Sequence, residues 1–159
     1  MGSDMTSHSL RGSARETHRF RRSGQPRVAM SDVRLTLPAQ PESIPVIRHV
    51  LGAFAEALRL PPDMVEDMRL AVTEACTNVV RHAYDDDEAG SIDVVMQPSP
   101  ERLQVIVSDR GRGMGPSPDV GGPGLGLPLI AALSDSLELE EAPMGGNRLR
   151  MSFTRLGIV

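Results

Sequence analysis

Apolar and polar residues recur with two different periods along this chain. Residues 33–37 alternate between apolar and polar side chains, which is the pattern of a half-buried strand. Over 43–58 the apolar residues recur every three or four positions, and this spacing predicts an amphipathic helix. A second stripe with the same spacing, over 65–79, predicts another helix that ends near Tyr84. The patterned part of the chain therefore opens with one strand and two helices.

The start of the second helix carries a capping sequence. Two prolines come just before Asp63, a residue type whose side chain accepts hydrogen bonds from the free N–H groups of a first helical turn. Glu66 follows three residues later, at the spacing of a capping box. We therefore expect Asp63 to be the N-cap and Glu66 to be its partner.

Beyond the second helix the pattern favours strands. Two apolar runs flank the turn Pro98-Ser-Pro-Glu and indicate an antiparallel pair, and two more flank a Gly-rich turn near the C-terminus. A short apolar helix lies between the two pairs. The expected ranges are 92–96 and 103–108 for the first pair, 125–133 for the helix, and 137–141 and 148–155 for the second pair. This order of elements predicts an α+β two-layer sandwich, a mainly antiparallel sheet with helices on one face.

The chain has 159 residues, enough for one domain with its own apolar core. Residues 1–30, whose first residues resemble a cloning sequence, are rich in Ser, Arg and Gly and are predicted to form a disordered tail. Six arginines against two acidic residues make this tail basic, so residues 31–159, the predicted domain, are acidic. An acidic domain argues against direct binding to nucleic acid. The tail is either a solvated extension or a binding segment for an acidic partner.

Several site classes are excluded by residue types that the sequence lacks or holds once. No lysine occurs, and because a P-loop places a lysine on the β- and γ-phosphates, a Walker-type nucleotide site is excluded. Cys76 is the single cysteine, so no disulfide forms within the chain. No apolar run reaches the roughly 20 residues of a transmembrane helix, and none follows the N-terminal arginines as in a signal peptide. We therefore expect a cytoplasmic protein without membrane association.

Three polar residues form a ridge on the second helix. Glu74, Asn78 and His82 are spaced four residues apart, so they share one face of the helix beside the apolar stripe. Polar groups in that position need hydrogen-bonding partners or a ligand. The alternative is a solvated helix face, and this pattern alone does not decide between the two. His82 either supports a site on the ridge or caps a buried network.

Two glycine-rich segments follow the ridge. The first, Asp109-Arg-Gly111-Arg-Gly113, comes directly after an apolar strand, where a carboxylate is costly unless it accepts hydrogen bonds. Its glycines allow a sharp turn and the close approach of a ligand. The second, from Gly121 to Gly126, leads into a helix and would present free backbone N–H groups to an anion. Each segment alone also fits an ordinary loop.

The three motifs together resemble the GHKL ATPase and kinase family. A helical ExxxN, then DxGxG after a strand, then a Gly-rich loop before a helix match the family's N, G1 and G2 boxes in order. The run from Glu74 to Tyr84, in a domain of this size, is similar to the RsbW-type anti-sigma factor serine kinases of that family. The turn 145–149 resembles the family's last box. The resemblance implies a Bergerat, histidine-kinase-like ATPase fold.

The resemblance also implies ATP and Mg²⁺ as ligands. Asp109 matches the aspartate that accepts a hydrogen bond from the adenine amino group, and Gly111 and Gly113 let the base lie close to the backbone. Asn78 matches the Mg²⁺ ligand, and Glu74 matches the catalytic carboxylate that orients or deprotonates a serine hydroxyl. The remaining positions matched to ATP binding are Gly122, Gly124, Leu125 and Gly126 around the phosphates, Asn147 in the last box, and His82.

The function implied is an ATP-dependent switch. An RsbW-type kinase holds a sigma factor away from RNA polymerase and phosphorylates a small anti-anti-sigma protein of the STAS type on serine, and such proteins are homodimers. Two other functions fit the same motifs. One is a regulatory module that binds ATP and sequesters a partner without phosphotransfer, and the other is the ATPase part of a sensor histidine kinase. Against the second, His82 lies within the predicted nucleotide ridge, a poor place for a phosphoacceptor.

Overall fold

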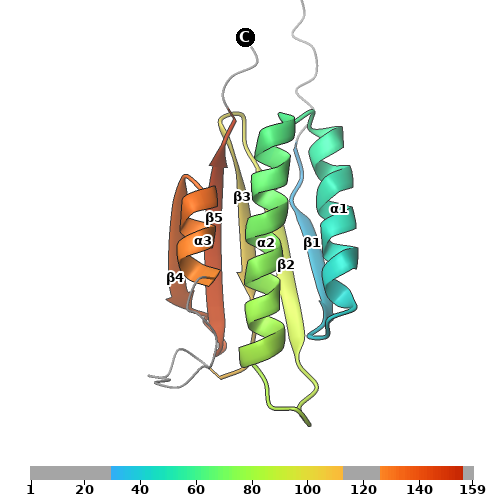
Figure 1. Cartoon of the computed structure of the whole chain (residues 1–159), viewed down its shortest axis with the longest axis vertical. Coiled ribbons are helices and arrows are strands. Elements are labelled where there is room, and N and C mark those ends of the chain that lie inside the picture. The colour runs from blue at the N-terminus through green and yellow to red at the C-terminus, as the bar shows by residue number, and fades with distance from the viewer. Residues whose placement is uncertain (1–29, 113–125, 156–159) are drawn as a thin grey trace, which may run out of the picture.

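The computed structural model describes residues 30–112 and 126–155. They form a five-stranded antiparallel sheet with three helices packed on one face (Figure 1). The strands, in the order in which they pair, are β1 (Val33–Pro38), β2 (Ser91–Pro98), β3 (Arg102–Ser108), β5 (Asn147–Thr154) and β4 (Ser136–Glu141). The helices are α1 (Ser43–Ala57), α2 (Pro62–His82) and α3 (Gly126–Leu133). The predicted α+β sandwich and its element order are confirmed.

The alternation of side chains fixes which face of the sheet the helices cover. Leu35 of β1 pairs with Val94, Val94 with Val107, and Val107 with Leu149 of β5. Because opposite residues in an antiparallel pair point to the same face, this register places one apolar row across four strands. The three members on β2, β3 and β5 are at most 7% exposed. The helices therefore pack on the face that carries this row.

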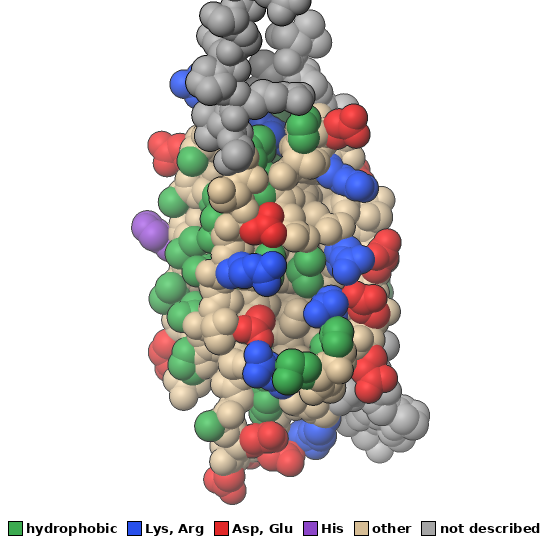
Figure 2. Space-filling view, turned by 180° about the vertical axis from the view of Figure 1, so that it is seen from behind, with side chains coloured by type: hydrophobic (Ala, Val, Ile, Leu, Met, Phe, Trp, Pro, Cys, Tyr) green, Lys and Arg blue, Asp and Glu red, His purple; other side chains and the backbone are tan. Residues whose placement is uncertain are grey.

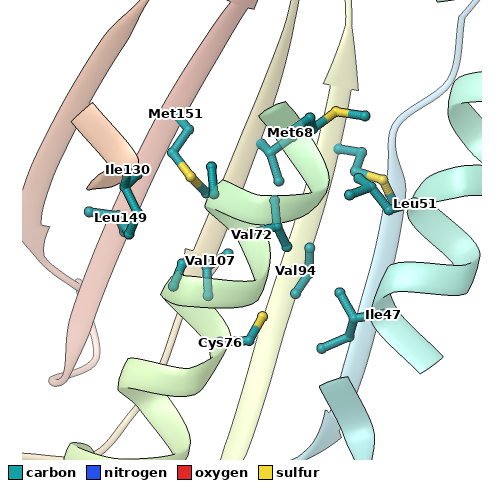
Figure 3. Close-up of a cluster of buried hydrophobic side chains, with 14 of the residues drawn as sticks. Ile47, Leu51, Met68, Val72, Cys76, Val94, Val107, Ile130, Leu149 and Met151 are labelled. Carbon is teal, nitrogen blue, oxygen red and sulfur yellow. The ribbon is translucent and has the colours of Figure 1, made fainter. Parts of the chain in front are cut away.

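Helix α2 lies over the middle of the sheet and supplies much of the core. Figure 3 shows Val72 and Cys76 of α2 above Val94 and Val107, with Met68 one turn away. On one side of α2, α1 contributes Ile47 and Leu51, and on the other side Ile130 of α3 lies beside Leu149. Fully burying an aliphatic side chain contributes about 1.5–3 kcal/mol, so this stripe holds α2 firmly on the sheet.

The start of α2 differs from the expected capping box. The helix begins at Pro62, its N-cap is Pro61, and no side chain caps it. Glu66 instead pairs with Arg69 at 3.0 Å, and the prediction for Asp63 and Glu66 is wrong. Proline is favoured at the first helical position because its fixed φ suits the helix and its missing N–H would be unpaired there. Two prolines in succession therefore set the helix start two residues earlier than expected.

The other face of the sheet carries no helix among the described residues. Figure 2 shows this face, with positive and negative side chains interspersed over the strands. It has a hollow near the turn between β4 and β5, beside Arg34, Asp93 and Arg148. Arg148 lies 3.7 Å from Glu140, and Asp93 lies 3.9 Å from Arg110, so acidic partners accompany the basic side chains. In the described part of the chain, no helix is long and apolar enough to span a membrane.

Candidate nucleotide-binding site

The polar ridge of α2 lies along the C-terminal half of that helix. Glu74 and Asn78 are half-buried, whereas His82, the last residue of α2, is exposed. Within the described residues Glu74 makes no hydrogen bond or ion pair. The exposure of His82 does not fit the interpretation that it caps a buried network. His82 and Arg81 stand in the last turn, where positive charge is favourable.

Asp109 comes directly after β3 and is only 3% exposed. Its Oδ1 accepts hydrogen bonds from the backbone N–H of Gly111 at 2.9 Å and of Asn147 at 3.3 Å. From the described residues, its Oδ2 accepts only a long hydrogen bond, 3.5 Å, from Nδ2 of Asn147. A carboxylate has about four lone-pair sites, so Oδ2 retains the capacity to accept a hydrogen bond from a ligand. These donors also supply the partners that a buried carboxylate requires.

The turn after Asp109 packs against the end of α2. The backbone N–H of Arg112 donates to the carbonyl of Ala83 at 2.8 Å. A Cβ atom at Gly111 would overlap that same carbonyl. Glycine at 111 is therefore required by the protein's own backbone, a reason that the sequence did not reveal. The carboxylate turn and the polar ridge consequently meet at one end of the sheet, where Figure 1 places the end of α2 and the end of β3.

The turn between β4 and β5 closes on Asp109 from the other side. Gly145 and Gly146 both have positive φ, +87° and +85°. A Cβ at Gly146 would overlap the carbonyl of Asp109, so only glycine at this position allows the turn to lie this close to Asp109. Asn147 then pairs with Asp109 in both directions, because the N–H of Asp109 also donates to the Asn147 carbonyl at 3.0 Å. The last box thus contributes to the surroundings of Asp109.

The first residue of α3 lies against Asn78. A Cβ added at Gly126 would lie 3.1 Å from Nδ2 and 3.3 Å from Oδ1 of Asn78. The N-terminus of α3 is thereby placed beside the amide of the ridge. Four other residues expected to bind ATP, Gly113, Gly122, Gly124 and Leu125, lie outside the described residues.

The described residues thus combine three kinds of polar group at one end of α2. They are a buried carboxylate with free acceptor capacity, an amide oxygen on Asn78, and a half-buried carboxylate one helical turn from that amide. An amide oxygen is a hard ligand of the kind that Mg²⁺ takes together with water and phosphate oxygens. Among the described residues no three His, Cys, Asp or Glu side chains converge as a metal site.

Comparison with known proteins identifies the family. A family model described as the histidine kinase-like ATPase domain matches residues 37–153. The chain belongs to this family. Two similar proteins are serine-protein kinases RsbW. The protein from Bacillus licheniformis is 35% identical over 123 residues, which cover 68% of this chain and 77% of the relative. The protein from Halalkalibacterium halodurans is 36% identical over 124 residues, which cover 69% and 75%. The chain therefore groups with the RsbW serine-protein kinases.

Solved structures support the fold. The crystal structure of the RsbU and RsbW domains of a Mycobacterium tuberculosis protein superposes with a TM-score of 0.63 at 21% identity, over 77% of this chain and 32% of that one. The histidine kinase domain of a blue-light activated histidine kinase from Erythrobacter litoralis gives a TM-score of 0.53 at 22% identity, over 69% and 61%. The expected histidine-kinase-like ATPase fold is confirmed.

Sequence reasoning gave no role to Tyr84, although it stands in the run that carries the resemblance. The structure places its hydroxyl between β2 and the turn that follows Asp109. The signal available in the sequence was that this is the single tyrosine of the chain, next to the polar ridge. The spacing alone does not tell which distant backbone groups a side chain will reach.

Proposed function

We propose that this protein is an ATP-dependent serine kinase that acts as an anti-sigma factor. It binds ATP with Mg²⁺, sequesters a sigma factor, and phosphorylates an anti-anti-sigma protein of the STAS type on serine. The observation that carries the proposal is the meeting of three segments at the C-terminal half of α2. Asp109 reaches this end through the contact of Arg112 with Ala83, and Gly126 reaches it through Asn78.

In the proposed complex, Asp109 binds the base and α2 binds the phosphates through Mg²⁺. The free acceptor capacity of Oδ2 suits the adenine amino group, which is a hydrogen-bond donor. The side-chain oxygen of Asn78 coordinates Mg²⁺, which usually keeps several waters and bridges phosphate oxygens. Gly126 begins α3 beside Asn78, and the free backbone N–H groups of a helix N-terminus suit phosphate oxygens. Asn147 and the exposed His82 complete the expected ATP-binding set.

Glu74 is the proposed catalytic residue. It lies one helical turn from Asn78, it is half-buried, and no described residue pairs with it. In that position its carboxylate would accept the proton of a serine hydroxyl or hold that hydroxyl toward the γ-phosphate. General base catalysis of this kind contributes typically 10²–10⁴-fold to a rate.

The partners follow from the relatives rather than from particular surface residues. Kinases of the RsbW group are the relatives that the chain resembles over most of its length. Homodimerisation is proposed on the same basis, through the region of β1 and α1, where β1 is an edge strand of the sheet. An edge strand leaves backbone groups free to pair with a second chain.

The first test is nucleotide binding measured by isothermal titration with ATP and ADP, with and without Mg²⁺. Asp109→Asn preserves the shape of the side chain and removes its charge, so we expect it to weaken ADP binding by at least about tenfold, the scale of a hydrogen bond to a charged group. Asp32→Asn is the matched control, because Asp32 also accepts a hydrogen bond from a side-chain amide, that of Gln97 at 2.8 Å, but lies at the opposite end of the sheet. Absence of nucleotide binding by the unmodified protein would refute the proposal.

The second test separates a kinase from a module that binds ATP without phosphotransfer. The protein is mixed with ATP–Mg²⁺ and a candidate STAS-type protein from the same organism, and phosphoserine on that protein is measured by mass spectrometry. Glu74→Gln should abolish the phosphoserine signal and leave ADP binding intact. Sequestration of the sigma factor without phosphoserine, in the presence of ATP, would favour the binding module.

A further inference from the structure

Tyr84 lies two residues after the end of α2, at the point where three segments meet. Its hydroxyl donates a hydrogen bond to the carbonyl of Ser91, at the start of β2, at 2.8 Å. The same hydroxyl accepts a hydrogen bond from the backbone N–H of Arg110 at 2.9 Å. Its ring packs so closely on Gly90 that a Cβ there would overlap the ring. The tyrosine thus ties the turn after Asp109 to the start of β2.

The turn after Asp109 is attached to this end of α2 by two further contacts. The N–H of Arg112 donates to Ala83 at 2.8 Å, and the Arg112 guanidinium lies 2.8 Å from the carboxylate of Asp85. The second contact joins two side chains that are 62% and 70% exposed, so solvent screens it and it contributes little. The side chain of Asn147 adds only a long, exposed hydrogen bond, 3.4 Å, to the carbonyl of Arg112. The hydroxyl of Tyr84 links this turn to β2 through two shorter hydrogen bonds, a half-buried one to Ser91 and a solvent-exposed one from Arg110.

We infer that Tyr84 is a positioning residue for the nucleotide. Its hydroxyl fixes the separation between Asp109 and the ridge of α2, so that one ligand reaches Asp109 with its base and Asn78 with its metal-bound phosphates. This inference rests on the proposed function. A ligand that must satisfy two sites at once binds more tightly when the protein already holds the sites at the required separation, because less order is lost on binding.

The hydroxyl group, rather than the aromatic ring, carries this role. The hydroxyl oxygen of Tyr84 accepts the hydrogen bond from the Arg110 N–H, and its proton goes to the Ser91 carbonyl. Phenylalanine would keep the ring on Gly90 and remove both hydrogen bonds. Among the described residues, the turn would then retain its contact with Ala83 and keep only the ion pair of Arg110 with Asp93, at 3.9 Å, as a side-chain link to β2.

The test compares the affinity of ADP–Mg²⁺ for the full-length protein and for Tyr84→Phe. Loss of the two hydrogen bonds should raise the Kd about tenfold. Ser134→Ala is the matched control, because Ser134 also donates a half-buried hydroxyl to a backbone carbonyl, that of Ile130 at 2.8 Å, at the C-terminal end of α3. The control should bind ADP–Mg²⁺ as the unmodified protein does.

A double-mutant cycle with Asn78→Ala distinguishes positioning from simple loosening of the fold. If the hydroxyl acts by holding the two sites in relation to each other, Tyr84→Phe should weaken binding by less than about twofold once Asn78 no longer binds the phosphate end, because coupled residues are not additive. The inference would be overturned if Tyr84→Phe weakened binding equally in the unmodified protein and in Asn78→Ala, or if it did not weaken binding in the unmodified protein. Either result would leave the proposed function standing. Absence of binding by the unmodified protein would overturn both.

Hydrogen exchange on the unmodified protein provides a measurement that no folding defect can obscure. The amide hydrogen of Arg110 should exchange slowly without nucleotide. Its exchange rate should fall further on addition of ADP–Mg²⁺, together with the exchange rates of the Gly111 and Arg112 amides. If ADP–Mg²⁺ protects Gly111 and leaves Arg110 exchanging freely, the hydroxyl does not hold the turn in the bound state and the inference is wrong.

Discussion

The amide of Asn78 lies against the α carbon of Gly126, so that even one added methyl group would come within 3.1 Å of Nδ2. The ridge of α2 thus lies beside the first residue of α3, in a space that a larger residue than glycine would share with the amide. If a larger residue replaces Gly126, the Asn78 amide must shift by a few tenths of an ångström to relieve the contact. The side chain that must shift is the proposed Mg²⁺ ligand, so the consequence falls on the phosphate end of the site.

We therefore expect Gly126→Ala to weaken ADP–Mg²⁺ binding about tenfold without lowering the free energy of unfolding. Alanine is the better helix former by about 1 kcal/mol in a helix interior, and part of that gain at the first residue of α3 offsets the cost of the contact in the unliganded protein. Gly52→Ala on α1 is the control, because the added methyl group meets the end of the flexible Arg69 side chain there. Titration with ADP–Mg²⁺ and urea unfolding of both variants provide the comparison. Equal affinity in the two variants would show that Asn78 tolerates the shift.

The turn between β4 and β5 offers a second comparison between adjacent glycines. Both have positive φ, but a Cβ at Gly145 meets nothing within 4 Å, whereas one at Gly146 overlaps the carbonyl of Asp109. Gly145→Ala should lower the free energy of unfolding by about 1 kcal/mol, the cost of a left-handed conformation. Gly146→Ala should lower it by about 2 kcal/mol more, because the backbone contact must also open. Urea unfolding measures both, and similar values would mean that the turn moves away from Asp109 at little cost.

The fold was predictable because periodicity reports which face of each element is buried. The alternation over residues 33–37 and the stripe over 65–79 reappear as β1 and α2, and every element expected in the described residues is present. The position of Asp109 at the end of a buried strand was likewise visible, since an acidic residue after an apolar run is a local pattern. Local patterns of this kind survive because packing reinforces them.

The contacts that assemble the site could not be predicted in the same way. Gly111 was assigned to the approach of a base, yet its closest neighbour in the protein is the carbonyl of Ala83. The role of Tyr84 depends on its hydrogen bonds with Arg110 and Ser91, and the pairing of β2 with β3 brings these two residues together. Contacts between residues distant in the sequence depend on how the elements pack, and no local spacing encodes them. The roles assigned to Glu74 and Asn78 remain predictions.

Asn147 provides a test of the polar surroundings of Asp109. Its Nδ2 donates to Oδ2 of Asp109 at 3.5 Å, and Asn147→Asp would place a second carboxylate there. Two adjacent carboxylates resist simultaneous ionisation, so the pKa of one member of the pair should be raised above its value in the unfolded chain. Stability gained from a raised pKa is present at low pH and lost as the pH rises. The free energy of unfolding of this variant, relative to the unmodified protein, should therefore fall between pH 4 and pH 7.

Asn147→Ala is the control for that experiment, because it removes the donor without adding a charge. Its free energy of unfolding should lie below that of the unmodified protein by a similar amount at pH 4 and at pH 7. Urea unfolding across this range measures both variants. A pH-independent penalty in Asn147→Asp would show that the turn carries the new carboxylate away from Asp109.

The buried thiol of Cys76 should make the free energy of unfolding depend on pH. The thiol lies on the face of α2 that meets the sheet, it is fully buried, and burial raises its pKa from 9.0 to about 12. The unfolded chain loses the thiol proton from pH 9 upward, while the folded protein retains it, so the free energy of unfolding falls as the pH rises from 9 to 12. At pH 10 the loss relative to pH 8 should be about 1.4 kcal/mol, the equivalent of one pKa unit. Cys76→Ala should lack this component, so the difference between the two proteins isolates it.

The native thiol should also react with a soluble disulfide reagent at pH 8 only as fast as the protein unfolds, because the thiolate is the nucleophile. Rapid labelling of the folded protein would show that α2 separates from the sheet far more readily than its packing implies.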